Sequence, residues 1–238
     1  MIYVGVCGFP AKRELIFKTL DAVELQDTFY NMPSFERLSK LKSEAPSDFK
    51  FSVKVFQGLT HSISSPTMKK AKNFIPSPKH GLLRPTKENL ELWERFKKET
   101  VVLNPVLYVF QTSQSFGTED DLKGAYEFFK EIHNEARIGW EPRGKAYENP
   151  SYLIKIFEDL GIVHIVDPFR RKPITSSGFQ YFRLHGRGGE EVNYGYNYTD
   201  ADLLELYQRV KDYEESYVMF NNIKMFDNAK IFKTKFVR

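Results

Sequence analysis

Residues 149–167, NPSYLIKIFEDLGIVHIVD, contain one complete helix-to-strand unit. Asn149 is a typical helix N-cap, and Pro150 suits the first helical position because the N–H that it lacks would have no partner there. Gly161 suits the left-handed residue that ends a helix. The apolar run 162–167 that follows is typical of a buried strand. This stretch therefore predicts a helix that leads directly into a strand.

The same alternation extends in both directions along the chain. Further helices are predicted after capping residues, namely Ser34, Thr86, Thr118 and Thr199. Apolar runs between turn residues predict eight strands, at residues 2–7, 22–26, 50–55, 105–111, 137–143, 162–167, 180–185 and 216–221. Strands that alternate with helices favour parallel pairing, and eight units close a barrel. We therefore expect an α/β fold, a TIM-like (β/α)8 barrel.

The expected repeat is irregular after the sixth and eighth strands. Residues 167–179 contain two prolines and no helical period, and the segment after residue 221 is short for a full helix. A doubly wound sheet is the alternative fold, but no G-x-G-x-x-G motif follows any strand. A length of 238 residues suits one barrel, so we expect a single domain over residues 1–238. A long basic loop and helix insertion lies at about residues 60–99.

The charge of the chain is unevenly distributed. Residues 69–98 contain nine Lys or Arg and three Glu, and residues 224–238 contain five Lys or Arg and one Asp. The net charge is only +4, so the rest of the chain is acidic. Two basic segments can attract an anionic ligand or nucleic acid, although solvated lysines on helix surfaces are the commoner explanation.

Composition and cysteine content exclude several classes of protein. With 41% hydrophobic residues the chain has no signature of disorder, and no run approaches the roughly 18 apolar residues of a membrane span. The N-terminal MIYVGVCGFP is typical of a first strand, so we expect a cytoplasmic protein with no membrane partner. The single Cys7 excludes an internal disulfide and a cysteine-rich zinc site, and is either a nucleophile or a small buried hydrophobe. The oligomeric state is left open.

Strand alternation predicts which polar side chains point into the barrel. Apolar residues mark the side that packs on helices, so the residues between them face inward. Near the carboxyl ends of the strands this rule selects carboxylates, cations, an imidazole and amides, namely Glu24, Gln26, Lys54, Gln111, Glu141, Arg143, Arg183, His185 and Asn221. Asp167 ends the sixth strand. Barrel enzymes keep their active sites at this face.

The inward set favours an anionic ligand. Lysine supplies a point charge and arginine a planar fork for phosphate or carboxylate, here from Lys54, Arg143 and Arg183. His185 is the best acid or base because its ordinary pKa lies near 6.5, and Glu24 or Glu141 can serve as its partner. We expect the inward residues of the fifth and seventh strands to converge on one cavity. The alternative is an internally paired network with only a structural role.

Several spaced motifs resemble one known family over nearly the whole chain. They are VELQDTFYNMPS at 23–34, KFSVKV at 50–55 with Thr60-His61 downstream, VFQTSQSF at 109–116, EPR at 141–143, YFRLHGR at 181–187 and MFNN at 219–222. These are similar to motifs of the YecE-like family, or domain of unknown function 72, which is believed to be a TIM-like barrel without a settled activity. By matched position the resemblance implies a site of Glu24, Thr28, Tyr30, Lys54, His61, Gln111, Glu141, Arg143, Arg183, His185, Arg187, Asn221 and Asn222.

Together these observations predict an enzyme that hydrolyses or isomerises a small anionic substrate, although catalysis itself stays open. The expected catalytic residues are His185, Glu141 and Glu24, and the expected substrate-binding residues are Lys54, His61, Gln111, Arg143, Arg183, Arg187, Asn221 and Asn222. No cofactor or metal is predicted, but the carboxylates and His185 leave a divalent metal open. The alternative is a nucleic-acid-binding or repair-associated, endonuclease-like barrel, in which bases stack on Tyr194, Tyr196 and Tyr198. These tyrosines can equally cover the barrel mouth.

Overall fold

The computed structural model describes residues 1–175, 178–189 and 191–237, and leaves out the side chain of Lys70. Four residues of segments discussed above therefore lie outside the described part, namely Ser176, Ser177, Glu190 and Arg238. The chain forms two compact units, which are treated separately. Unit 1 contains Met1–Glu24, Glu44–Lys50 and Val163–Arg238, and unit 2 contains Leu25–Ser43 and Phe51–Ile162.

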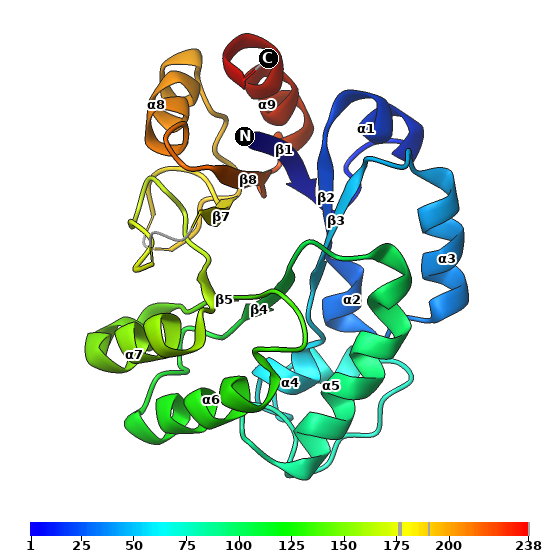
Figure 1. Cartoon of the computed structure of the whole chain (residues 1–238), viewed down its shortest axis with the longest axis vertical. Helices are drawn as coiled ribbons and strands as arrows, with labels where there is room; N and C mark the ends of the chain where they lie inside the picture. Colours follow the sequence, from blue (N-terminus) through cyan, green and yellow to red (C-terminus); the bar gives the residue numbers. More distant parts are fainter. Residues whose placement is uncertain (176–177, 190, 238) are drawn as a thin grey trace. The chain divides into compact units, whose positions relative to one another are not determined.

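Unit 1 is built on parallel strands from both ends of the chain. Its elements are β1 (Ile2–Cys7), α1 (Arg13–Thr19), β2 (Ala22–Leu25, whose last residue belongs to unit 2), β6 (Val163–His164), β7 (Phe179–Leu184), α8 (Asp200–Val210), β8 (Glu215–Phe220), α9 (Met225–Phe232) and a final π-helical turn, Lys233–Val237 (Figure 1). Parallel pairing joins β2 to β1, β1 to β8 and β8 to β7. The first strand of the chain thus lies between the second and the last.

Unit 2 repeats the strand-then-helix order. Its elements are α2 (Asp27–Tyr30), α3 (Phe35–Glu44, whose last residue belongs to unit 1), β3 (Lys50–Lys54, whose first residue belongs to unit 1), α4 (Gln57–Thr60), η1 (Met68–Lys70), α5 (Lys87–Thr100), η2 (Val101–Leu103), β4 (Tyr108–Gln111), α6 (Glu119–Ile132), β5 (Ile138–Glu141), η3 (Gly144–Glu148) and α7 (Pro150–Leu160). The strands β3, β4 and β5 pair in parallel. Their carboxyl ends therefore lie at one edge.

All eight expected strands and the capped helices are present. The predicted N-caps at Thr86, Thr118 and Thr199 accept backbone N–H groups, the last two within capping boxes. Gly161 ends α7 at φ 62°, as predicted. Asn149 precedes Pro150, but its side chain does not cap the helix and instead donates to the Gly117 carbonyl at 3.0 Å.

The structure also contains helices that the sequence did not predict. These are α1, α2, α4 and α9, and each begins without a side-chain cap. The cap signals that identify helices in a sequence are therefore missing from them. Residues 167–175 form no helix, which confirms the irregularity expected after β6. Within the described residues, no helix is both long and apolar enough to cross a membrane.

Aromatic packing shows which face of β4, β5 and β8 packs against the helices. Trp140 of β5 stacks on Phe157 of α7 with ring centroids 5.6 Å apart, and Phe110 of β4 meets Phe129 of α6 at 5.3 Å. In unit 1, Phe220 of β8 packs on Phe232 of α9 at 5.8 Å. The residues that alternate with these rings face the other side of their strands.

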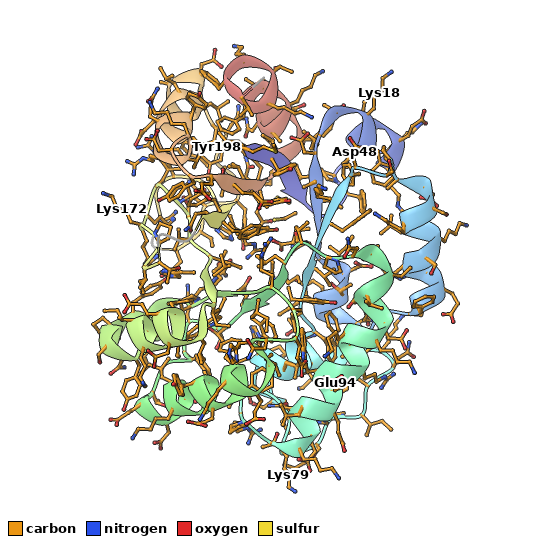
Figure 2. All side chains as sticks on the ribbon, in the orientation of Figure 1. Lys18, Asp48, Lys79, Glu94, Lys172 and Tyr198 are labelled. Carbon is orange, nitrogen blue, oxygen red and sulfur yellow. The ribbon has the colours of Figure 1, made fainter. Side chains whose placement is uncertain are left out.

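Local ion pairs involve three of the nine basic residues in the segment 69–98. Lysines 79, 87 and 97 pair with glutamates of α5, at 3.1, 3.5 and 2.9 Å. The guanidinium of Arg84 donates to the carbonyls of Gly81 and Pro78. Lys79 lies at the periphery of unit 2, where its side chain points outward (Figure 2). These glutamates are the three already counted in the segment, so its excess of basic residues remains.

Candidate functional site

Five of the expected site residues lie at the carboxyl ends of the strands of unit 2. Lys54, Gln111 and Glu141 are the last residues of β3, β4 and β5. The register of β4 and β5 places Gln111 opposite Glu141, Arg143 follows two residues later, and His61 follows α4. We refer to Lys54, His61, Gln111, Glu141 and Arg143 as the unit 2 cluster.

The short helix α2 positions Lys54. The Thr28 hydroxyl lies 2.7 Å from the Lys54 carbonyl oxygen and 3.2 Å from that of Leu25, so it ties the two strand ends of this unit together. The Lys54 ammonium lies 4.3 Å from the ring centroid of Phe29, and Lys54 is only 7% exposed. A cation over a ring face in a poorly hydrated place is favourable. Thr28, which the resemblance implies for the site, thus acts through the backbone of Lys54.

Arg143 and Glu141 form a close ion pair. Nε and Nη2 of Arg143 lie 2.7 and 2.6 Å from the same carboxylate oxygen of Glu141. The two side chains are 13% and 8% exposed. A charge-assisted contact of this kind fixes the plane of the guanidinium. Glu141 therefore orients Arg143 and offsets its charge.

His61 is held neutral beside these cations. Its Nδ1 lies 2.8 Å from the Thr60 hydroxyl, and its ring meets Phe29 edge-on at 5.1 Å. Burial, and then the charges of Lys54 and Arg143, lower the pKa of His61 to about 4. An imidazole with this pKa is uncharged near pH 7.

We expect His61 to make folding stability depend on pH. Its pKa is about 4 in the folded protein and 6.5 ordinarily, so between these values the unfolded chain binds a proton that the folded chain does not. Stability is therefore lost as the pH falls from 6.5 toward 4, by roughly 2 to 3 kcal/mol. Urea unfolding of wild type and His61→Gln at pH 7 and pH 4.5 should show a smaller loss in the variant. His133→Gln is the control, and an equal loss in wild type and His61→Gln contradicts the prediction.

In unit 1, Glu24 and Arg183 form a fully buried pair. Nη2 of Arg183 lies 3.0 Å from Oε1 of Glu24, and both side chains are 0% exposed. The Tyr181 hydroxyl donates to the other oxygen of Glu24 at 2.9 Å. Tyr181 and Arg183 alternate with the helix-facing residues of β7, as the inward positions should. Both oxygens of Glu24 therefore have partners within unit 1.

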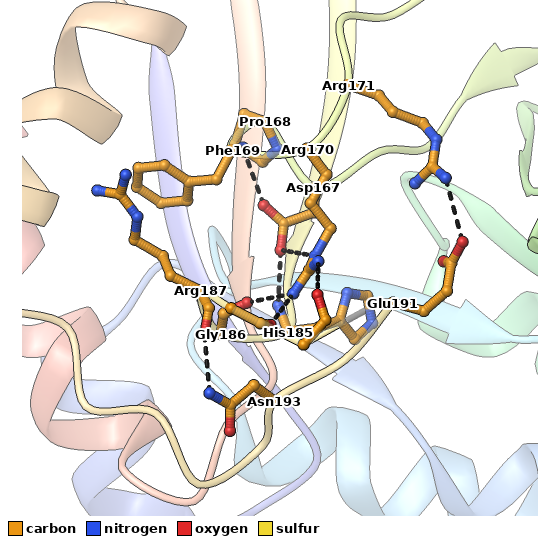
Figure 3. Close-up of polar contacts among 12 residues, drawn as sticks. Asp167, Pro168, Phe169, Arg170, Arg171, His185, Gly186, Arg187, Glu191 and Asn193 are labelled. Atoms are coloured by element: carbon orange, nitrogen blue, oxygen red, sulfur yellow. Dashed lines mark hydrogen bonds and ion pairs between the residues drawn. The ribbon is translucent and has the colours of Figure 1, made fainter.

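Asp167, which follows β6, organises the chain around His185. Its carboxylate accepts the backbone N–H groups of His185 and Phe169, each at 3.0 Å (Figure 3). Nε of Arg170 lies 3.8 Å from the same carboxylate. The backbone of His185 is further fixed because its carbonyl accepts the N–H of Asn193 at 2.7 Å.

The guanidinium of Arg170 holds the loop that follows His185. It donates to the carbonyls of Gly186, Gly188 and Gly189 at 2.7, 2.8 and 3.1 Å. The N–H of Gly186 donates to the Tyr198 hydroxyl at 2.8 Å. Burial, and then the negative charge of Asp167, raise the pKa of Tyr198, so this phenol stays protonated. The loop is therefore held by hydrogen bonds to its backbone, of which the one from Gly186 to Tyr198 is buried.

The remaining expected residues of unit 1 have partners close by. Arg187 pairs with Asp202 and Glu205 of α8, both at 2.7 Å. Nδ2 of the buried Asn222 donates to the carbonyl of Tyr196 and to Asn228, both at 2.8 Å. Backbone contacts place Asn221 beside β7, since its N–H donates to the Leu184 carbonyl.

The loop tyrosines and Cys7 differ in exposure. Tyr198 is 4% exposed and Tyr194 is 42% exposed, with its ring centroid 6.0 Å from that of His185. Tyr196 donates to Asp202 at 2.8 Å. Cys7 is buried. Of the described residues, no three His, Cys, Asp or Glu form a group that could hold a metal ion.

Sequence reasoning missed several residues that build these sites. Tyr181 shares the inward parity of Arg183, so alternation would have selected it had tyrosine been counted with the polar residues. No sequence pattern identifies Phe29 or Arg170. A ring that lies beside an ammonium group, or a guanidinium that donates to backbone carbonyls, requires no particular spacing in the sequence. The expected convergence of the fifth and seventh strands on one cavity stays a prediction.

Solved structures with the same fold define the class of the protein. A DUF72 family protein from Enterococcus faecalis V583 matches with a TM-score of 0.73 at 17% identity, over 98% of this chain and 94% of that chain. One from Thermotoga maritima MSB8 matches with a TM-score of 0.69 at 23% identity, over 98% of both chains. A xylose isomerase domain containing protein from Salmonella typhimurium LT2 has a TM-score of 0.58 at 14% identity, over 94% of this chain and 88% of that chain. The fold is a TIM-like barrel, as predicted.

The sequence itself assigns the family within this class. The family model described as protein of unknown function DUF72 matches residues 11–236. The chain therefore belongs to this family, which confirms the resemblance of its motifs. No curated protein matches the chain in sequence.

Proposed function

We propose that the unit 2 cluster binds the phosphate or carboxylate group of a small substrate, which the protein hydrolyses or isomerises. The supporting observation is the gathering of Lys54, Arg143 and His61, which is close enough for the two cations to depress the pKa of the imidazole. Cations held near one another in a partly dehydrated place attract an anion strongly.

The three side chains supply different contacts to an anion. Lys54 is a point charge, and Arg143 is a planar donor whose direction Glu141 fixes. When the Thr60 hydroxyl donates to Nδ1 of His61, the imidazole proton lies on Nε2 and is available to an oxyanion. A neutral donor of this kind adds a hydrogen bond without adding to the repulsion between the cations.

In unit 1, His185 stays the predicted acid or base. The Asp167 carboxylate and the Asn193 N–H hold its backbone on both sides. Glu24 accepts from Tyr181 and pairs with Arg183, so an orienting or structural role suits it better than carrying a proton. Glu141 is in turn committed to Arg143.

Phosphate should stabilise the wild-type protein more than a variant that lacks the Lys54 charge. At ten times its dissociation constant, an anion that binds only the folded state adds about 1.4 kcal/mol, or roughly 3 to 6 °C in Tm. Lys54→Met and Arg143→Met should each bind phosphate at least about tenfold more weakly. Thermal unfolding at increasing phosphate concentration measures both effects.

Lys130→Met, on the exposed side of α6, is the matched control and should keep the full phosphate response. Equal phosphate responses in Lys54→Met and wild type would contradict the proposal. Oligonucleotide binding that weakens steeply with salt, and that Lys54→Met leaves unchanged, would favour the nucleic-acid alternative instead.

A further inference from the structure

A hollow in unit 1 lies at the amino ends of the strands. It has a volume of about 380 Å³, and it is lined by Tyr3 near the start of β1, Asp21 before β2 and Lys50 at the start of β3. Lys18 from the last turn of α1 and Lys233 from the end of the chain complete its cationic lining. Lys233 belongs to the basic segment 224–238, which the proposed function does not use.

The charges around this hollow leave it cationic. Lys233 pairs with Asp21 at 2.7 Å, and the other oxygen of Asp21 accepts the N–H of Val4 at 3.0 Å. Within the part of the chain that the structure describes, neither Lys18 nor Lys50 makes an ion pair. The Lys50 ammonium instead lies 6.0 Å from the ring centroid of Tyr3.

The other carboxylate of the lining is Asp48, which is exposed, as Lys18 is, and which Figure 2 labels beside α1. Three lysines therefore line the hollow together with two carboxylates, of which Asp21 is paired with Lys233.

A second hollow of about 670 Å³ adjoins the first and shares three of its lining residues, namely Phe17, Lys18 and Pro46. Phe17 is held in place because its ring meets Phe49 edge-on at 4.8 Å. The second hollow is also lined by Arg13 and Glu44, which pair with each other at 2.8 Å, and by the exposed Glu14. The part that the two hollows share therefore combines the apolar Phe17 and Pro46 with the cationic Lys18.

We propose that the two hollows form one binding site for a small organic phosphate. The phosphoryl group binds the ammonium groups of Lys18, Lys50 and Lys233, and the apolar part of the ligand packs on Phe17 and Pro46. Convergent ammonium groups suit a compact dianion. The apolar wall adds affinity in proportion to the ligand surface that it covers. This site is independent of the unit 2 cluster.

Backbone amide NMR with phenyl phosphate tests this site. We expect saturable shifts of the amides of Tyr3, Lys18 and Lys50, with phenyl phosphate binding about tenfold more tightly than inorganic phosphate. Lys18→Met and Lys50→Met should each weaken this binding about tenfold. Both side chains are at least partly exposed, so both variants should keep the wild-type fold.

Lys12→Met, at the start of α1, is the matched control and should bind phenyl phosphate like the wild type. Shifts at these amides that grow without saturation, or that Lys18→Met and Lys50→Met leave unchanged, overturn the proposal. Equal affinities for inorganic and phenyl phosphate overturn the part assigned to Phe17 and Pro46. A loss of phosphate binding in Lys54→Met concerns only the unit 2 cluster. The amide shifts of Tyr3, Lys18 and Lys50 report binding at the present site separately.

Discussion

Arg183→Met is expected to destabilise the protein by about 3 to 5 kcal/mol. The substitution removes a guanidinium 3.0 Å from the Glu24 carboxylate, which is 0% exposed and keeps the hydrogen bond from Tyr181. A buried charge that loses its counterion costs far more than an exposed one. Urea unfolding at pH 7 measures the loss.

Two further variants make this result specific. Glu24→Gln combined with Arg183→Met should recover a large part of the loss, because no uncompensated charge then remains. Arg187→Met should cost about 1 kcal/mol or less, since the Arg187 side chain is 37% exposed and its ion pairs are screened. If Arg183→Met unfolds like the wild type but loses affinity for phosphate, Arg183 is a ligand-binding residue and not part of the architecture.

Gly186→Ala is expected to cost about 3 kcal/mol or more, and to displace the loop after β7. Gly186 has φ +87°, and a Cβ atom there would lie 2.0 Å from the carbonyl oxygen of Asn193. That oxygen belongs to the backbone, so it cannot move aside as a flexible side chain would. The hydrogen bonds of Gly186 with Arg170 and Tyr198 would be lost with the displacement.

Gly161→Ala provides the matched control for this substitution. Gly161 also has a positive φ, +62°, but nothing lies within 4 Å of the position of its added Cβ. It should therefore show only the backbone cost, about 1 kcal/mol. Unfolding free energies and hydrogen exchange at the amide of residue 186 report both effects. Similar losses in the two variants would show that crowding by Asn193 is unimportant.

Strand positions were predictable because the pattern that marks them in a sequence is local. Apolar runs between turn residues located all eight strands, and alternation along β7 identified Arg183 as inward. The helices α1 and α9 were missed because packing, and not a side-chain cap, determines where they begin. Packing depends on residues far away in the sequence, which a local window does not contain.

Alternation along the strands predicts which polar side chains share a face, but not which of them pair. Alternation selected Glu24, Glu141, Arg143 and Arg183, yet it could not tell which carboxylate would pair with which guanidinium. Arg143 pairs with its neighbour Glu141, two residues away, whereas Arg183 pairs with Glu24 from the other end of the chain. Only the three-dimensional arrangement specifies a partner at that separation.

The pairing of β1 with β8 has a consequence for synthesis on the ribosome. Ile2 lies opposite Ser216, so one edge of β1 has no partner until β8 has been made. At about 5–20 residues per second, that delay is roughly 10 to 40 s. During this time an apolar strand with open hydrogen-bonding groups is exposed to other chains and to chaperones. The yield of folded protein in a cell should therefore depend on how this N-terminal strand is protected while it waits.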